Sequence, residues 1–166
     1  MKRLWTPWRL SYILGEEERV KGCLFCQVAQ IEQDRETYVL YRAEHCFVIL
    51  NRYPYNNGHL MVVPYRHVPS LETLSSETAA QLIGLVQQSL GILRDVYQPD
   101  GFNMGVNEGQ AAGAGIEEHI HFHIVPRWSG DSNYMSVIGD TRVIPELLEE
   151  SFQQLAPRFA ELESSI

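Results

Sequence analysis

His119-Ile120-His121-Phe122-His123-Ile124-Val125 is the stretch that decides how this sequence is interpreted. Side chains alternate between the two faces of a strand, so this stretch predicts that the three histidines share one face, about 6.5–7 Å apart, with apolar residues facing the core. Three adjacent imidazoles have no packing rationale. Neutral imidazole titrates near physiological pH and carries a free lone pair. The pattern therefore favours nucleophilic or acid–base catalysis over a metal site made of these histidines or an exposed polar face.

A glycine-rich segment precedes the histidines. Residues 107–115 have the sequence Asn-Glu-Gly-Gln-Ala-Ala-Gly-Ala-Gly. Glycine and alanine let the backbone approach a ligand closely and turn N–H groups toward an anion. Such a loop is by itself most often a flexible turn. Its position just before three alternating histidines predicts a loop that holds phosphate.

The rest of the chain predicts a run of strands, one long helix, more strands and a last helix. We expect strands at 38–41, 45–50, 59–64, 102–106 and 119–125, the last stopping at Pro126. A long helix should run from Ser75 or Ser76 to about Tyr97. A last helix should start near Pro145 and be kinked or ended by Pro157. Its predicted inner residues are Leu147, Leu148, Phe152, Leu155 and Phe159. This order predicts an α+β fold with an antiparallel sheet, in one domain (1–166) with an N-terminal arm (1–22) and a C-terminal extension (128–166).

The chain is acidic overall. Its 166 residues include 13 Lys and Arg against 21 Asp and Glu, which gives a formal net charge of −8. This balance opposes binding to nucleic acid or to an anionic membrane, so a phosphate-containing substrate would need a local positive field. No apolar run is long enough to span a membrane, and residues 1–10 lack the apolar core of a signal peptide. We therefore expect a cytoplasmic protein.

The three cysteines fall into two groups. Cys23 and Cys26 form a C-x-x-C pair, which in a reducing compartment is typical of metal binding or redox chemistry and is also compatible with an incidental pair. Cys46 lies in an apolar run and is expected to be a buried core thiol.

At this point the sequence resembles the histidine-triad (HIT) family. Its signature, His-φ-His-φ-His-φ-φ with φ apolar, matches residues 119–125 at every position, and Asn107-Glu108-Gly109 and Gly58-His59-Leu60 match the accompanying motifs. Further stretches at 4–9, 50–56, 58–65, 126–131 and 143–148 resemble the diadenosine tetraphosphate phosphorylase subgroup. The resemblance implies a HIT-like α+β fold, namely a five-stranded antiparallel sheet with a long helix and a C-terminal helix, and it implies a homodimer.

The resemblance also implies roles for individual residues. His121 would attack the α-phosphorus of a nucleotide and form a nucleotidyl-histidine, with His59, His119 and His123 completing the catalytic set. Asn107 would bind phosphate. Asn51 would face the ribose, at a position where many relatives carry an acid but the phosphorylase subgroup does not. The remaining nucleotide-binding residues that the resemblance implies are Gly113, Ala114 and Gly115, whose N–H groups would hold the oxyanion. Trp128 and Arg127 are further candidates that would shape the pocket mouth, and packing and surface charge are the equal alternative for them. Relatives often carry a hydroxyl residue in place of Gly115.

The resemblance implies a structural zinc ion held by Cys23, Cys26, His67 and His119; the alternative is a pair of reduced thiols that pack the N-terminal segment. His45, closer to the thiols in sequence, is a substitute candidate for the third ligand, but a surface turn position is favoured for it. No organic cofactor is expected. The expected reaction converts diadenosine tetraphosphate and phosphate into ATP and ADP. The alternatives are a hydrolase or a purine-nucleoside phosphoramidase that releases AMP, a nucleotide-binding regulatory module without turnover, and a zinc-dependent interaction module.

Overall fold

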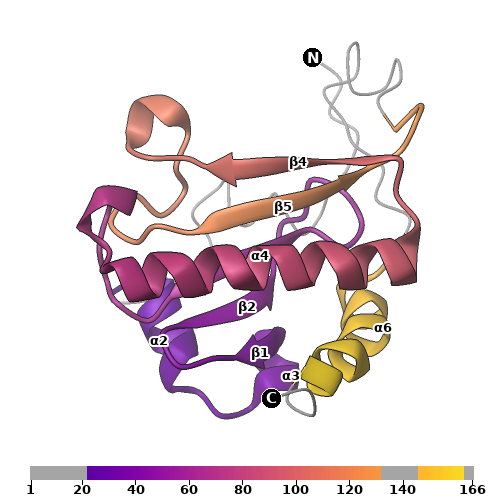
Figure 1. The fold of residues 1–166 in the computed structure, drawn as a ribbon, viewed down its shortest axis with the longest axis horizontal. Helices are drawn as coiled ribbons and strands as arrows, with labels where there is room; N and C mark the ends of the chain where they lie inside the picture. The colour runs from indigo at the N-terminus through magenta and orange to yellow at the C-terminus, as the bar shows by residue number, and fades with distance from the viewer. Residues whose placement is uncertain (1–21, 132–145, 163–166) are drawn as a thin grey trace.

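The computed structural model describes residues 22–131 and 146–162, and within them one five-stranded antiparallel sheet forms the centre of the fold (Figure 1). The strand order is β1-β2-β3-β5-β4. The bounds are Val39–Arg42 for β1, Cys46–Leu50 for β2, Leu60–Pro64 for β3, Gly101–Val106 for β4 and Phe122–Arg127 for β5. The sequence predicted the first four to within a residue or so. Residues 1–21 of the predicted N-terminal arm and residues 132–145 and 163–166 of the predicted C-terminal extension, Pro145 among them, lie outside the described residues.

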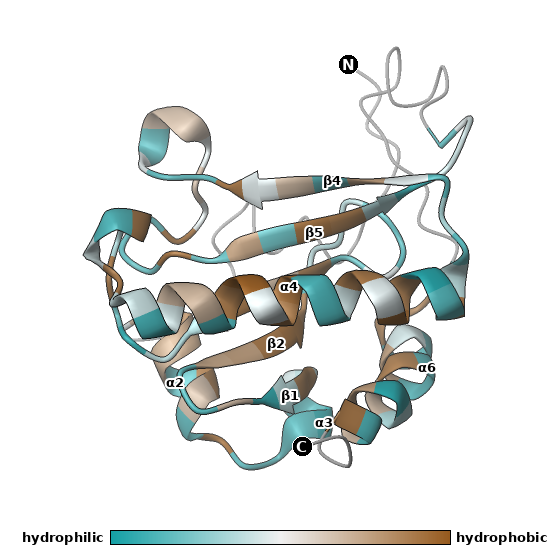
Figure 2. Cartoon of the chain, in the orientation of Figure 1, coloured by the Kyte–Doolittle hydropathy of each residue, from teal (hydrophilic) through white to brown (hydrophobic). Residues whose placement is uncertain are grey.

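One face of the sheet is covered by α4 (Ser76–Tyr97) and α6 (Leu148–Ala160) (Figure 1). The Ser75 hydroxyl accepts the Thr78 N–H at 3.2 Å and caps α4 as predicted. Figure 2 shows apolar and polar bands alternating along α4, as expected for a helix with one buried side. Its buried Leu82, Leu85 and Leu93 pack with Cys46, Val48, Leu60, Val62, Ile124, Leu155 and Phe159. This cluster is the main core, and the buried position predicted for the Cys46 thiol is confirmed.

The opposite face of the sheet carries the histidines. The short helix α2 (Leu24–Gln30) packs there through Phe25 and Val28 against Phe47, Ile49, Met61 and Val63. His123 pairs with Met61 across β3 and β5, so its side chain lies on this face. The remaining short elements are α3 (Asp34–Thr37), η1 (Leu71–Thr73) and η2 (Gln110–Ala112). In the part of the chain that the structure describes, no helix is both long and apolar enough to cross a membrane.

The bounds predicted for the histidine strand are wrong at both ends. β5 begins at Phe122 because residues 119–121 leave the sheet ladder: the Ile120 N–H donates to the Val68 carbonyl at 2.8 Å. At its other end β5 runs through Pro126 to Arg127. The pairing of β3 with β5 ends at the Leu60–Ile124 pair, so at Pro126 only β4 is paired and the missing N–H is not needed.

The last helix differs from the prediction at Leu147, and of the two outcomes predicted for Pro157, a kink or the end of the helix, the end is wrong. Leu147 is 69% exposed, because it precedes the first helical residue and has an extended backbone that takes it out of the helical period. Pro157 lies inside α6, which continues to Ala160. The carbonyl that loses its partner there belongs to the exposed Gln153, which water can reach, so the helix tolerates the proline.

Candidate active site

His121 is buried with one ring nitrogen bonded to the backbone. Its Nδ1 lies 2.8 Å from the carbonyl oxygen of His119, and a carbonyl oxygen only accepts, so the proton of the neutral ring is on Nδ1. The Nε2 lone pair is then free for attack. The ring is 5% exposed, and its centroid lies 5.0 Å from that of Phe25 and 4.8 Å from that of His123.

A second chain of hydrogen bonds fixes His59 and His123. The Tyr55 backbone N–H donates to His59 Nδ1 at 3.0 Å, so this nitrogen is unprotonated and the proton of the neutral ring is on Nε2. His59 Nε2 then donates to His123 Nδ1 at 2.9 Å, which leaves the His123 proton on Nε2. The His59–His123 pair therefore presents a hydrogen-bond donor. Asn51 Nδ2, 3.4 Å from His59 Nε2, is a neighbour of this pair, because a protonated nitrogen has no lone pair to accept its hydrogen.

Burial keeps His121 and His123 neutral. It lowers the pKa of His121 and, joined by the charge that His121 would carry, lowers the pKa of His123 to about 4. The carbonyl bond to His121 opposes this effect without reversing it. At neutral pH, His121 is therefore an imidazole with a free lone pair, which is the form that attacks phosphorus.

The predicted nucleotide-binding residues are only partly brought to the histidines. Asn51 lies beside His59, and its Oδ1 accepts the Tyr53 N–H at 2.9 Å. Asn107 directly follows Val106, whose partner Phe122 directly follows His121, so Asn107 lies at the same end of the sheet as His121. Trp128 lies elsewhere: its ring makes an edge contact with Tyr97 of α4, on the opposite face of the sheet.

The glycine-rich loop folds on itself around η2. The N–H of Gly113 donates to the Gln110 carbonyl at 3.0 Å, and that of Ala114 donates to the Gly109 carbonyl at 3.3 Å. Positive φ angles at Gly109 (75°) and Gly113 (83°) make this turn possible. Two of the three N–H groups predicted to hold an oxyanion are thus used within the turn, so that prediction now rests on Gly115.

Cys23, Cys26, His67 and His119 come together as predicted, with their ligand atoms all within 4.8 Å of one another. His119 Nε2 donates to the Pro64 carbonyl at 2.8 Å, so His119 Nδ1 is left with its lone pair. This Nδ1 lies 3.3 Å from Cys23 Sγ, 3.6 Å from Cys26 Sγ and 3.3 Å from His67 Nδ1. Tetrahedral zinc with two sulfur and two nitrogen ligands separates neighbouring ligand atoms by about 3.3–3.8 Å, and the three spacings around His119 match that range.

Three features lie in or around this cluster: a thiol with a raised pKa, a histidine that is not a ligand, and an aromatic ring. Burial, with a further contribution from Cys23, raises the pKa of the Cys26 thiol, and a bound dication would reverse this shift. His45 is not in the cluster and lies beside Glu44, which agrees with a surface position rather than a ligand role. Phe25 stands between the two thiols in sequence, and its ring contacts both His119 and His121.

Sequence reasoning missed two residues at this site. Phe25 is separated from the histidines by more than ninety residues and has no catalytic side chain, but its place inside the C-x-x-C pair is a signal that could have been followed. Tyr55 acts through its backbone N–H and stacks its ring on His59 and His123, with centroids 4.6 and 6.0 Å away. A backbone donor leaves no residue-type signal in a sequence.

Comparison with known proteins identifies a family. Residues 32–130 match the family model of the HIT domain. The chain is 41% identical over 169 residues to the AP-4-A phosphorylase of Mycobacterium tuberculosis, which covers 96% of this chain and 85% of that protein. A Zn-bound histidine triad family protein from Mycobacterium smegmatis has a similar structure, with a TM-score of 0.68, 30% identity and coverage of 87% of this chain and 98% of that one. A protein described as a hypothetical histidine triad nucleotide-binding protein from Sulfolobus tokodaii matches with a TM-score of 0.68, 28% identity and coverage of 87% of this chain and 96% of that one. These likenesses confirm the predicted α+β fold.

Proposed function

This chain belongs to the HIT domain family, and from that premise we propose that it is an enzyme that transfers a nucleotidyl group from a dinucleoside polyphosphate to orthophosphate. With diadenosine tetraphosphate as substrate, the products are ATP and ADP. One observation carries the proposal: the buried His121 holds its proton on Nδ1 and keeps Nε2 free, beside a His59–His123 pair that presents a donor.

The chemistry proceeds in two displacements. His121 Nε2 forms a bond to the α-phosphorus, and the bond from that phosphorus to the bridging oxygen breaks, so ATP leaves with the bonding electrons. His123 Nε2–H donates a hydrogen bond to the leaving oxygen. An orthophosphate oxygen then attacks the adenylyl-His121, the P–N bond breaks, and ADP is released. Two displacements at phosphorus, with His121 as the intermediate carrier, replace one direct attack of orthophosphate on the polyphosphate, which is more difficult because both are anions.

The binding roles follow the same geometry. Asn51, beside His59, is proposed to contact the ribose, and Asn107, at the same end of the sheet as His121, is proposed to bind phosphate. The Gly115 N–H is proposed to face the oxyanion. The acidic chain has no large basic surface field to attract an anion, so these neutral donors have to act at short range.

We propose that Cys23, Cys26, His67 and His119 hold a structural zinc ion. The ligand spacings support a four-coordinate site with no open position, as in structural zinc sites. The zinc ion would tie α2 to the segment that carries His121. It would supply no chemistry to the reacting phosphate.

The proposal includes a homodimer in the cytoplasm. β4 is an edge strand of the described sheet, and its Met104 is 52% exposed, which supports contact with another chain along this edge. Size-exclusion chromatography with light scattering tests the mass.

Product analysis tests the reaction. Purified protein is incubated with diadenosine tetraphosphate, with and without orthophosphate, and the nucleotides are separated by chromatography. ATP and ADP formed only with phosphate support the proposal; AMP and ATP formed regardless of phosphate identify a hydrolase and refute it. The His121→Asn variant should lose turnover and keep nucleotide affinity. The His45→Asn variant, changed at a histidine outside both clusters, is the matched control and should keep both.

A further inference from the structure

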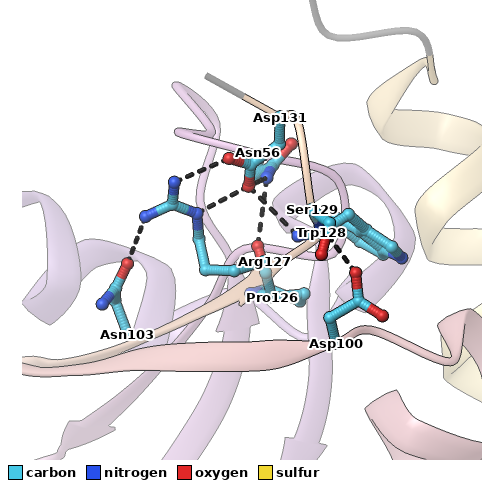
Figure 3. A network of polar contacts seen from close by, with 8 residues as sticks. All are labelled: Asn56, Asp100, Asn103, Pro126, Arg127, Trp128, Ser129 and Asp131. Atoms are coloured by element: carbon cyan, nitrogen blue, oxygen red, sulfur yellow. Dashed lines mark hydrogen bonds and ion pairs between the residues drawn. The ribbon is translucent and has the colours of Figure 1, made fainter.

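A polar network joins the end of β5 to the loop that precedes β3 (Figure 3). The Asp131 carboxylate, 12% exposed, accepts Nε of Arg127 at 2.6 Å and a second guanidinium nitrogen at 2.7 Å. It also accepts Asn56 Nδ2 at 2.8 Å and the Trp128 N–H at 3.2 Å. Figure 3 shows Arg127 extending to Asn103 on its other side. Charge-assisted bonds of this kind are stronger than neutral ones, so Asp131 is a firm anchor.

Asn56 is the residue through which this anchor reaches the loop. Its Nδ2 donates both to Asp131 and to the Pro126 carbonyl, at 3.1 Å. Its own carbonyl accepts the His59 N–H at 3.2 Å. The side chain of Asn56 is therefore bonded to the end of β5, and its backbone carbonyl is bonded to the N–H of His59. Its chain neighbour Tyr55 carries the N–H that bonds to His59 Nδ1.

The consequence concerns where the proton of His59 lies. A neutral imidazole has one proton and two nitrogens, and only an outside donor or acceptor fixes which nitrogen carries it. If the Tyr55 N–H moves away, His59 Nδ1 is free to take the proton, and Nε2 then stops donating to His123. His123 would in turn lose the bond that keeps its own proton on the Nε2 side. A wrong tautomer in such a relay lowers the rate even where the rings keep their places.

We infer that Asp131, acting through Asn56, is a positioning residue that keeps the Tyr55 N–H on His59 and so sets the tautomers of the His59–His123 pair. This inference rests on the proposed function for its kinetic consequence, but the tautomers themselves are a property of the free protein. The partners described above for Asp131 are Arg127, Asn56 and the Trp128 N–H, and none of them is one of the reacting histidines. The effect of Asp131 passes through one side chain, Asn56, and one backbone N–H.

The test compares three variants of the full chain. Asn56→Ala removes the link from the loop to Asp131. Asp131→Asn keeps the size of the anchor, removes its charge, and remains available if the first variant does not fold. Asn103→Ala is the matched control, since it removes a contact of Arg127 from the same network and leaves the bonds between Asp131 and Asn56. Long-range proton–nitrogen spectra of ¹⁵N-histidine protein distinguish Nδ1–H from Nε2–H rings without any substrate.

The expected result is a single Nε2–H form of His59 in the parent and in Asn103→Ala, and mixed tautomers in Asn56→Ala and Asp131→Asn. In the same two variants kcat for diadenosine tetraphosphate should fall roughly tenfold, with KM within about twofold, as expected for a weakened proton donor. Folded variants that keep the single tautomer and the parental kcat overturn the inference. A parent protein that does not turn over diadenosine tetraphosphate refutes the proposed function instead, and the spectra still decide the inference.

Discussion

Replacing Gly58 by alanine should strain the loop that carries His59. Gly58 has a φ of +67°, and a Cβ built there would lie 2.8 Å from Cε2 of Tyr97 and 3.2 Å from Cδ2 of Leu93. The left-handed backbone costs a non-glycine residue about 1–2 kcal/mol. Overpacking against a filled core costs about 1–3 kcal/mol more. The Tyr97 ring has little freedom to move aside, because its hydroxyl donates to Glu146 at 2.8 Å.

Together these terms predict that Gly58→Ala lowers the free energy of unfolding by about 2–5 kcal/mol, or the Tm by roughly 10 °C for a chain of this size. Urea unfolding followed by circular dichroism measures the change. Gly84→Ala is the control: Gly84 is inside α4, and a methyl group added there would meet nothing within 4 Å, so alanine should stabilise the protein by about 0.5–1 kcal/mol. A Gly58→Ala midpoint equal to the parental one would refute the reasoning.

Three further predictions concern the histidine face. The pKa of His123 is lowered to about 4 in the fold from 6.5, so the folded state prefers its neutral form; this stabilisation is complete above pH 6.5 and is lost as the pH falls toward 4. Between pH 7.5 and 5 the parent should lose roughly 2 kcal/mol more unfolding free energy in urea than His123→Gln, and equal losses would contradict the shift. If the proposed zinc ion is present at a hundred times its Kd, its removal by a chelator should lower the Tm by about 5–10 °C in calorimetry. The Tm of the Cys26→Ser variant should be the same with and without the chelator. The Phe25→Leu variant should keep its zinc content in a chromophoric assay, but its kcat should fall several-fold because the ring that packs on His121 is replaced by a smaller side chain. The Val28→Ala variant, on the same helix, should be less stable with kcat unchanged.

Much of the fold follows from local pattern. The apolar runs of β2 and β3, the apolar stripe of α4 and the Ser75 cap are all encoded within a few residues of where they act, and each was predicted to within a residue or so. The ligand cluster was accessible for a different reason. Cysteine and histidine are rare enough that the resemblance of Cys23, Cys26, His67 and His119 to known zinc ligands outweighed their separation along the chain.

The errors come from partners remote in sequence. β5 starts late because Val68 takes the backbone bond of Ile120, and no local pattern reports that. Because β5 was expected to stop at Pro126, the face of the sheet on which Trp128 lies was not predicted either. Counted through a strand that continues to Arg127, Trp128 falls on the α4 face with Phe122 and Ile124, away from the histidines. The link between Asn56 and Asp131 spans 75 residues and has no motif of its own.

Because Cys46 is buried, the number of thiols that react with an alkylating reagent reports the state of the other two cysteines. Cys46 is fully buried, and burial raises its pKa to about 12, so it stays protonated and out of reach of alkylating reagents while the protein is folded. The other two thiols belong to the Cys/His cluster that is proposed to bind zinc and are partly accessible. A short exposure to iodoacetamide followed by mass spectrometry should therefore report occupancy directly. Two added groups mark a chain whose cluster is empty, none marks a loaded chain, and a third appears only when the core has opened.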